Sequence, residues 1–330
     1  MPPAATSLSN WKEVHAALDS FPAPALSFGP EGDLEQTTWV FRGLKSTEYD
    51  LEPRIERDSK GKSCAWPALE SMQLLEFQSK APMYMNAYEL PDSDDKPSWL
   101  ALMQHQGVST RLLDFSYSPY VALYMALRER NETERRVGVA LWAIDATSIT
   151  NSAEGVFLKA KREYLEHRSP RVRRNRRNLI FDPRFFRTDR DTYEGSHTAW
   201  RERTRAAVAP QDIVRSHFNE KGFVDLALPP VQNRRLSNQQ GVFLVNGAEA
   251  LTFRDSLFAM MADQGDVWCK LYHVSSAALL EIEKKLFDMN IHELSMFPDG
   301  EGLAGFVRQK ARLHFALQAS ATSGSGDGLR

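Results

Sequence analysis

The chain has 330 residues, 42% of them hydrophobic, and its formal net charge is −2, because 41 Lys and Arg nearly balance 43 Asp and Glu. This length and composition predict a globular protein of one large domain or two ordinary ones. It has neither an apolar run of roughly 18 residues, which a membrane span requires, nor the pattern of a secretory signal, so we expect a soluble, cytoplasmic protein. Cys64 and Cys269 cannot build a disulfide framework and lack the paired spacing of a zinc site, so no metal is expected.

The first half of the chain is expected to hold two strands and three helices. Residues 37–42 are bulky and β-branched, so they predict the first strand, and Gly43 ends it. Ser118-Pro119 predicts the start of a helix, because Ser caps the first turn and Pro is tolerated at the first helical position. Helices are expected over 67–80, from Ser98 to Gly107 and over 120–129, and a buried strand over 137–144.

A basic segment follows, which the near-zero net charge conceals. Between Lys159 and Arg177 the chain has nine Lys or Arg and two Glu, a net charge of +7, so the remainder sums to −9. Clusters of Lys and Arg contact nucleic-acid phosphates irrespective of sequence, and we therefore predict a nucleic-acid-binding surface here. A solvated charge run is the alternative. The candidate contacts are Arg171, Arg173, Arg174, Arg176 and Arg177.

Strands and helices continue to mix in the second half without strict βαβ alternation, which favours the α+β class. Strands are expected over 240–245 and 268–274, and amphipathic helices over 276–288 and 303–317. No second composition boundary is present, so we predict a single domain over 31–318 with the Arg-rich insertion at about 155–215. A short N-terminal segment (1–30) precedes it, and a Ser/Gly-rich tail (319–330) is expected to be disordered.

Three segments concentrate polar residues where a site can form, and the first of them is Trp39–Gly43. Arg42 lies at the end of an apolar strand, so its guanidinium must reach an edge or a cleft, because unpaired burial is too costly. Its planar fork suits a phosphate or a carboxylate, and Gly43 would let a ligand approach the backbone closely. The alternative is a structural arginine paired with Glu52 or Asp50.

The second segment, Gln104–Phe115, spans a helix end, a loop and a strand. The imidazole of His105 has the chemistry of an acid–base or ligand-orienting group. Two structural alternatives stay open, since Asp114 can satisfy backbone donors at the start of the next helix and Arg111 can pair with Asp114 alone. The polar side chains of the segment include His105, Ser109, Thr110, Arg111 and Asp114.

The third segment, Ser237–Phe243, opens an apolar strand with two amides, Gln239 and Gln240, followed by Gly241. These amides can offer donors and acceptors to a ligand, and a simple loop-to-strand turn is the alternative. Several familiar signatures are absent from the sequence: the phosphate loop, the dinucleotide-binding G-x-G-x-x-G, the zinc-binding H-E-x-x-H and the nucleophile elbow G-x-S-x-G.

In their order, these segments resemble the FRG domain family, named for its Phe-Arg-Gly motif. The resemblance covers about residues 35–310. Two positions depart from the family pattern, because Ser109 stands where Pro is common and Phe115 where Trp is frequent. The matching segments are Phe41-Arg42-Gly43, Leu51–Arg54, the acidic helix around Glu70, Gln104–Asp114, Ser118–Tyr124, Gln239–Phe243 and Met296–Leu303.

The resemblance implies a three-part site similar to that of ADP-ribosyltransferases, on a split β-sheet core with flanking helices. By this similarity Arg42 would grip NAD, a hydroxyl of the second segment would support the ribose, and Gln240 would contact a ribose hydroxyl. Asp114 or His105 would activate the acceptor. The catalytic residues expected in this way are Arg42, His105, Thr110, Asp114 and Gln240. The residues expected to bind NAD are Arg42, Gly43, Ser109, Thr110, Arg111 and Gln239.

The third motif departs from the pattern of many such transferases, which carry a Glu where this chain has Gln239-Gln240-Gly241. An amide cannot place negative charge beside an oxocarbenium-like centre, so another carboxylate would have to contribute. Asp114 is the first candidate and Glu249 the second.

The resemblance therefore favours an NAD-dependent ADP-ribosyltransferase that acts as a toxin or anti-phage effector, with NAD as substrate and no metal. The Arg-rich insertion favours RNA, or another nucleic acid, as the acceptor, and an effector of this kind would need an antitoxin or chaperone partner. Two other functions stay open. One is a metal-independent nuclease or hydrolase that uses His105 and Asp114, and the other is a non-catalytic module in which Arg42 and Arg111 hold a nucleotide.

Overall fold

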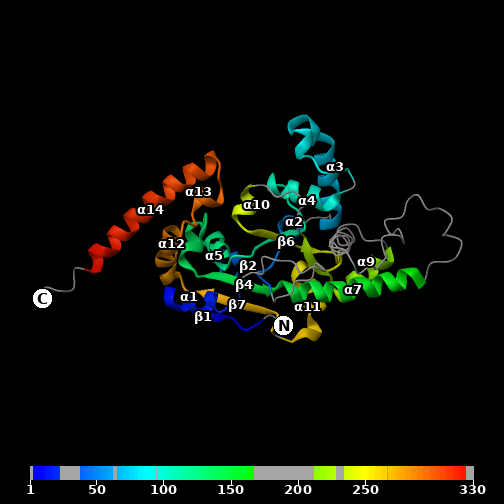
Figure 1. The fold of residues 1–330 in the computed structure, drawn as a ribbon, viewed down its shortest axis with the longest axis horizontal. Coiled ribbons are helices and arrows are strands. Elements are labelled where there is room, and N and C mark those ends of the chain that lie inside the picture. Colours follow the sequence, from blue (N-terminus) through cyan, green and yellow to red (C-terminus); the bar gives the residue numbers. More distant parts are fainter. Residues whose placement is uncertain are drawn as a thin grey trace.

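The computed structural model describes residues 3–22, 38–61, 65–93, 95–166, 212–227, 234–265 and 267–324. Its centre is a seven-stranded sheet with helices on both sides (Figure 1), so the α+β class is confirmed. Residues 167–211, which hold most of the predicted basic insertion, lie outside the described part of the chain. None of the described helices is long and apolar enough to cross a membrane.

The strands are arranged in the order β1-β7-β4-β2-β3-β6-β5. All neighbours are antiparallel except β1 and β7. β2 pairs with β4 along its whole length, but it pairs with β3 only where Phe41 meets Ser116. The sheet therefore has two blocks that meet at a narrow β2–β3 seam. The strands are β1 (Thr6–Leu8), β2 (Trp39–Leu44), β3 (Leu112–Ser116), β4 (Val139–Asp145), β5 (Val224–Ala227), β6 (Gly241–Asn246) and β7 (Cys269–Val274).

Two hydrophobic clusters cover the two faces of this sheet. On one face α1 (Trp11–Asp19), α5 (Pro119–Leu127) and α12 (Leu279–Asp288) pack against strand residues such as Phe41 and Leu141. On the other face, the cluster around Val40 and Trp142 takes side chains from the helices on that side. These are α3 (Trp66–Tyr84), α4 (Lys96–His105), α7 (Ala146–Glu166), α9 (Asp212–Lys221) and α11 (Phe253–Met260).

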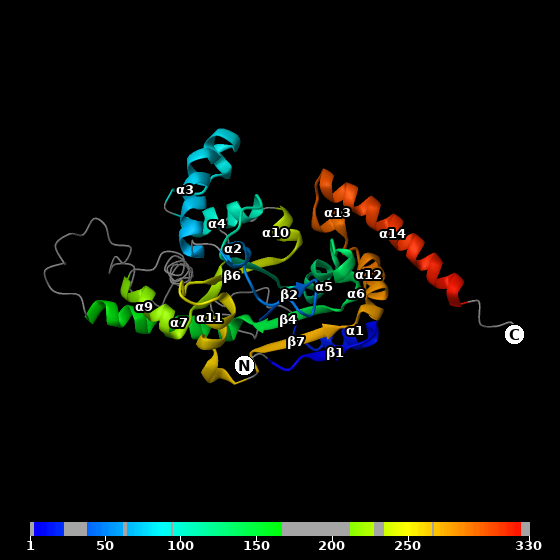
Figure 2. The ribbon, with the colours of Figure 1, turned by 180° about the vertical axis from the view of Figure 1, so that it is seen from behind.

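Shorter elements and one long helix complete the fold. In Figures 1 and 2, α3 rises from the body, while α14 runs outward from α13 toward the C-terminus. The remaining elements are α2 (Arg54–Ser59), η1 (Ala87–Glu89), α6 (Glu132–Arg136), α10 (Arg234–Asn238), η4 (Ala262–Gln264), η5 (Ser276–Ala278), α13 (Glu293–Met296) and α14 (Gly300–Gly324).

The prediction that Gly43 ends the first strand is wrong, because β2 continues to Leu44. Its physical role is different: a Cβ at Gly43 would overlap the carbonyl oxygen of Ala122 in α5. The missing side chain therefore lets α5 lie directly against β2, and the close approach that Gly43 permits is that of a helix backbone.

Other elements agree with the sequence in kind and differ at their ends. Ser118 caps α5 as predicted, by accepting a hydrogen bond from the backbone N–H of Val121. The cap of α4 is Asp95 and not the predicted Ser98, which lies inside the helix and donates to the Asp95 carboxylate (2.7 Å). The predicted first strand is preceded by β1, and α14 extends to Gly324, into the stretch for which a disordered tail was predicted. The domain boundaries stay a prediction.

Candidate functional site

Arg42 lies at the β2–β3 seam and bridges it with its side chain. Its Nη1 donates to the carbonyl oxygen of Asp114 (2.6 Å) and lies 3.9 Å from Asp114 Oδ2, while its buried Nε has no hydrogen-bond partner. Burial lowers the pKa of the guanidinium, and the Asp114 charge opposes that shift. Because a buried donor without a partner is costly, this guanidinium is suited to an anionic ligand.

The predicted structural partners of Arg42 are wrong. Glu52 pairs with Lys60 (2.6 Å), and Asp50 pairs with Arg254 (2.8 Å). These pairings leave Asp114 as the carboxylate beside Arg42.

Asp114 combines a fixed carboxylate with access to solvent. Its Oδ1 accepts a hydrogen bond from Gln104 Nε2 (2.8 Å), and its side chain is 63% exposed, against 19% for Arg42. The alternative in which Asp114 caps the next helix is wrong, because Ser118 is that cap. The carboxylate is therefore positioned by an amide and can still meet a reactant.

Gln104 is the residue that the sequence analysis missed as a site member. Its Oε1 accepts a hydrogen bond from the Thr110 hydroxyl, and its Nε2 donates to Asp114, so it joins the two. It lies in α4, near the helix end that Gly107 follows with a φ of +84°. Gln104 is the first residue of the Gln104–Asp114 segment that matches the FRG pattern, directly before His105, and this position could have identified it as a site residue.

The two hydroxyls of the second segment are buried. Thr110 Oγ1 also accepts from the backbone N–H of Leu112 (3.3 Å), and Ser109 Oγ accepts from Gln73 Nε2 (3.4 Å). In this structure Thr110 acts on Asp114 through Gln104, which makes it a positioning residue. The contact of Ser109 or Thr110 with a ribose stays a prediction.

Arg111 is buried and joins α3 to the start of β3. Its Nη2 and Nε contact Glu70 Oε2 at 2.6 and 2.8 Å, and its backbone N–H donates to Glu70 Oε1 (3.0 Å). The guanidinium also lies over the Trp66 ring and 3.8 Å from Glu249. The alternative in which Arg111 pairs with Asp114 is therefore wrong, and its role as an NAD contact stays a prediction.

The glutamine turn before β6 is bound to the end of β3 beside the seam. Gln239 accepts at its carbonyl oxygen from Ser116 Oγ (2.7 Å), and Gln240 accepts at its carbonyl oxygen from the N–H of Tyr117 (2.9 Å). Gln240 has a φ of +47°, a left-handed conformation that is uncommon outside glycine. Ser116 pairs with Phe41, the residue before Arg42 in β2. The turn is therefore bonded to the strand residue that lies opposite the neighbour of Arg42.

The C-terminal motif supports this turn from the other side. Gln239 Nε2 donates to the carbonyl oxygen of Met296 (3.2 Å), and Asn238 Nδ2 donates to that of Ser295 (2.7 Å). Phe297 lies between two guanidinium groups, those of Arg128 (4.0 Å) and Arg235 (4.6 Å). The motif that begins at Met296 therefore holds the glutamine turn in place.

His105 faces a different set of charges. Its side chain is at the exposed end of α4, and its pKa is lowered first by burial and then by Arg235, while Asp299 opposes the shift. Arg235 and Asp299 are themselves paired (3.8 Å). The charges that act on the imidazole thus come from α10 and from the segment before α14.

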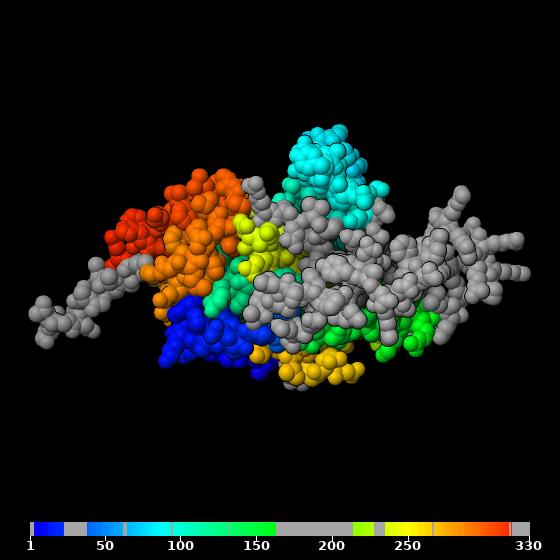
Figure 3. Space-filling model, viewed as in Figure 1, coloured from blue at the N-terminus to red at the C-terminus, as the bar shows by residue number. Residues whose placement is uncertain are grey.

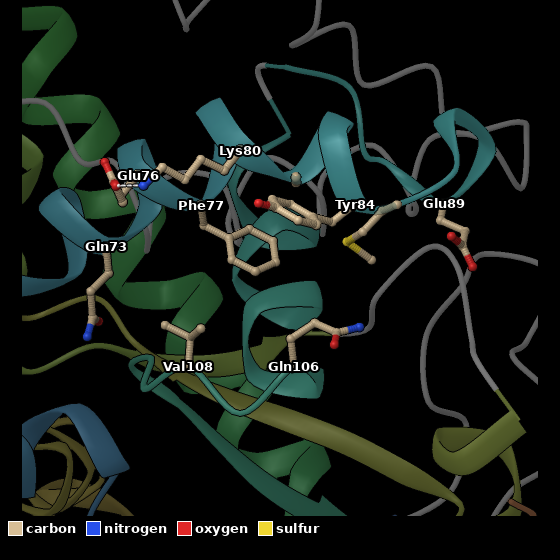
Figure 4. Close-up of a pocket in the computed structure, with 10 residues that line it drawn as sticks. Gln73, Glu76, Phe77, Lys80, Tyr84, Glu89, Gln106 and Val108 are labelled. Atoms are coloured by element: carbon tan, nitrogen blue, oxygen red, sulfur yellow. Dashed lines mark hydrogen bonds and ion pairs between the residues drawn. The ribbon is translucent and has the colours of Figure 1, made fainter.

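Two hollows of the described part of the chain have linings that do not include Arg42, Thr110 or Gln240. The larger, about 610 Å³, lies between α3, η1 and the loop after α4 (Figure 4). The smaller, about 280 Å³, lies beside β1 and β7. The larger one shares a wall with the site, because Val108 lines it and Ser109 and Thr110 follow directly.

The comparisons identify the region that carries Arg42 and Asp114. Residues 37–135 match the family model of the FRG domain. The chain contains an FRG domain. Searches among curated proteins and among solved structures returned no match. The FRG match runs from just before β2 into α6, so it includes the Arg42 and Asp114 segments, while the glutamine turn lies beyond it.

Two predictions about binding, the nucleic-acid contacts and the absence of a metal, are not tested by the structure. The predicted nucleic-acid contacts Arg171, Arg173, Arg174, Arg176 and Arg177 all lie in residues 167–211. Within the described ranges, no group of three or more His, Cys, Asp and Glu side chains is arranged to hold a metal ion, and metal independence stays a prediction.

Proposed function

We propose that this FRG-domain protein is an NAD-dependent ADP-ribosyltransferase whose site lies at the β2–β3 seam. The observation that carries the proposal is the pairing of unlike groups there. Arg42 is a largely buried cation with an unpartnered Nε, and beside it Asp114 is an exposed carboxylate held by Gln104. The narrow seam between the two sheet blocks supports the split core that such transferases have.

Arg42 would bind the anionic part of NAD. A guanidinium with donors left unused in a partly dry site favours phosphate oxygens, since hydrogen bonds between charged partners are about twice as strong as neutral ones. Asp114 is bound at Nη1, whereas Nε has no hydrogen-bond partner, so the guanidinium has donor capacity left for a second anion. The glutamine turn, fixed by Ser116 and Tyr117, would present the Gln240 amide to a ribose hydroxyl.

Asp114 would serve the chemical step. The bond between the ribose C1′ and the nicotinamide nitrogen breaks, and its electron pair leaves with nicotinamide. The acceptor oxygen or nitrogen then attacks C1′, and its proton passes to the Asp114 carboxylate and on to water. The same carboxylate places negative charge near the oxocarbenium-like centre, which the Gln240 amide cannot do.

Nucleic acid, and RNA in particular, is the acceptor that we propose. The net charge of +7 between Lys159 and Arg177 is the observation that favours a phosphate-rich acceptor over a protein. A transferase acting on RNA would serve as a toxin or anti-phage effector in the cytoplasm, held in check by an antitoxin or chaperone partner.

The test is to incubate the full chain with labelled NAD and either total RNA or total protein, and to measure released nicotinamide and label on each acceptor. We expect label on RNA and stoichiometric nicotinamide. Lack of nicotinamide release with any acceptor contradicts the proposal. Thermal stabilisation by NAD without release would instead indicate a binding module, and RNA shortening without NAD would indicate a nuclease.

A further inference from the structure

The large exposed apolar side chains gather on two arms of the molecule. One arm is α3 with η1, where Met72, Leu75, Met83, Tyr84 and Tyr88 are 62–83% exposed. The other is α14, where Leu303, Val307 and Phe315 are 52–67% exposed. Figure 3 shows both arms standing clear of the body. Soluble monomers rarely expose apolar side chains in groups, so these arms have the composition of contact surfaces.

On α14 the exposed apolar residues form a single stripe. Leu303, Val307, Ala311 and Phe315 recur every four residues, which places them along one helix face. The opposite face packs on the body, where Leu313 is buried and Gln309 Nε2 donates to Glu283 Oε1 of α12 (3.2 Å). The helix is thus held from one side, and its apolar stripe faces away from the body.

The α3 arm provides a hollow for such a stripe. The cavity of about 610 Å³ has an apolar floor, and Figure 4 shows the rings of Phe77 and Tyr84 turned into it. Its rim carries Glu76, Lys80 and Glu89, and Lys80 is already paired with Glu76. The apolar lining residues are Phe77, Ala81, Tyr84, Met85 and Val108.

The two arms also carry opposite charge. Apart from Glu70, which is buried and paired with Arg111, residues 66–95 contain five Asp or Glu and one Lys. In α14 the exposed cations are Arg308 and Lys310, together with Arg312, which is paired with Glu283. An apolar helix stripe flanked by cations therefore matches an apolar hollow rimmed by carboxylates, which is the chemistry of helix-in-groove recognition.

We propose that two copies of this chain form a symmetric dimer in which α14 of each copy occupies the α3–η1 hollow of the other. The occupant is a second copy because α14 leaves the body away from α3 in both views (Figures 1 and 2). One chain supplies both surfaces, so a two-fold axis satisfies both at once and closes the assembly. This inference does not depend on the proposed enzyme activity.

The test uses the full chain in sedimentation velocity, with Val307→Glu for the stripe and Tyr84→Glu for the hollow. Val267→Glu is the matched control, because Val267 is 79% exposed and lies outside both arms. We expect wild type and the control to sediment as dimers and each arm variant as a monomer with an unchanged far-UV spectrum. Raising the salt concentration should weaken the wild-type dimer, because the arms attract by charge.

Mixing the two arm variants separates this arrangement from the other dimers. In a mixed pair, the intact α14 of one copy meets the intact hollow of the other, so one of the two contacts survives and a heterodimer returns. Dimers built from α14–α14 or α3–α3 contacts cannot be restored in this way. A monomeric wild type, polymers that grow with concentration, or a mixture that stays monomeric each overturns the proposal.

Discussion

Arg42 and Asp114 meet across the β2–β3 seam, where Arg42 Nη1 donates to the Asp114 carbonyl oxygen at 2.6 Å and lies 3.9 Å from Oδ2. The cation is mostly buried and the carboxylate mostly exposed, although they touch. This asymmetry leaves one member available to a reactant, and it is the reason for placing the proposed site here.

Gln104 is expected to act by positioning Asp114. In Gln104→Leu the carboxylate loses its 2.8 Å amide donor but stays in place, so we expect kcat for nicotinamide release to fall about 10–100-fold, less than the roughly 10²–10⁴-fold of losing an acid–base group outright. KM for NAD should change less than about twofold, because Arg42 is untouched. Steady-state kinetics with RNA as acceptor measure this split. A rise in KM with an unchanged kcat would show that Gln104 binds NAD directly.

Gly43 is expected to be intolerant of any side chain. In Gly43→Ala the new methyl group would overlap the Ala122 carbonyl oxygen, so α5 must move off β2. We expect a loss of about 1–3 kcal/mol in the free energy of unfolding. Gly155→Ala in α7 is the matched control, because a Cβ there meets nothing within 4 Å and should stabilise the helix by about 0.5–1 kcal/mol. Urea denaturation measures both, and equal effects would contradict the packing argument.

Local patterns predicted much of this fold, and contacts between distant segments decided the rest. The Ser118 cap and the β4 and β6 strands depend on neighbouring residues, which the sequence displays directly. The role of Gly43 depends on a helix that begins at Pro119, so a pattern over five residues could only suggest a strand end.

The same limit applies to the site. Arg42 and Asp114 were selected from their segments, and the structure brings them together. The partner of Arg111 is Glu70 in α3, which no spacing rule connects to it. Gln104 belongs to the motif, but its bridging of Thr110 and Asp114 depends on how α4 is oriented relative to β3. That orientation is a tertiary property.

Removing one partner of the Arg111–Glu70 pair is expected to destabilise the fold more than replacing both partners with apolar residues. Arg111→Ala leaves the Glu70 carboxylate buried without its guanidinium, and we expect a loss of about 3–5 kcal/mol in unfolding free energy. The double variant Arg111→Met with Glu70→Leu should lose clearly less, because both charges are gone. Lys284→Ala, which breaks an exposed pair with Asp288 in α12, should cost less than about 1 kcal/mol. Additive losses in the double variant would contradict the pairing.

Glu56 is expected to make stability depend on pH. Its Oε1 accepts from the N–H of Phe253 (2.7 Å), its Oε2 is buried without a partner, and burial raises the pKa of the carboxyl to about 7 from 4.5. The folded state therefore binds the proton more tightly than the unfolded one. The corresponding stability is fully present below pH 4.5 and is lost as pH rises through about 7, by up to about 3 kcal/mol.

Glu56→Gln should remove that dependence. Urea denaturation between pH 4.5 and 8 is expected to show a smaller decline for the variant than for wild type, with the variant more stable at pH 8. A wild-type stability that rises across this interval while the variant stays level would contradict the raised pKa of Glu56.

The measurement that tests the central claim most directly is nicotinamide release from NAD, with RNA present, by wild type, Arg42→Ala and Arg254→Ala. Arg254 is a surface arginine paired with Asp50, so its variant controls for loss of a positive charge. We predict release by wild type and by Arg254→Ala, and a loss of at least about 100-fold in Arg42→Ala. Release by Arg42→Ala at the wild-type rate would contradict the assignment of the site to the β2–β3 seam.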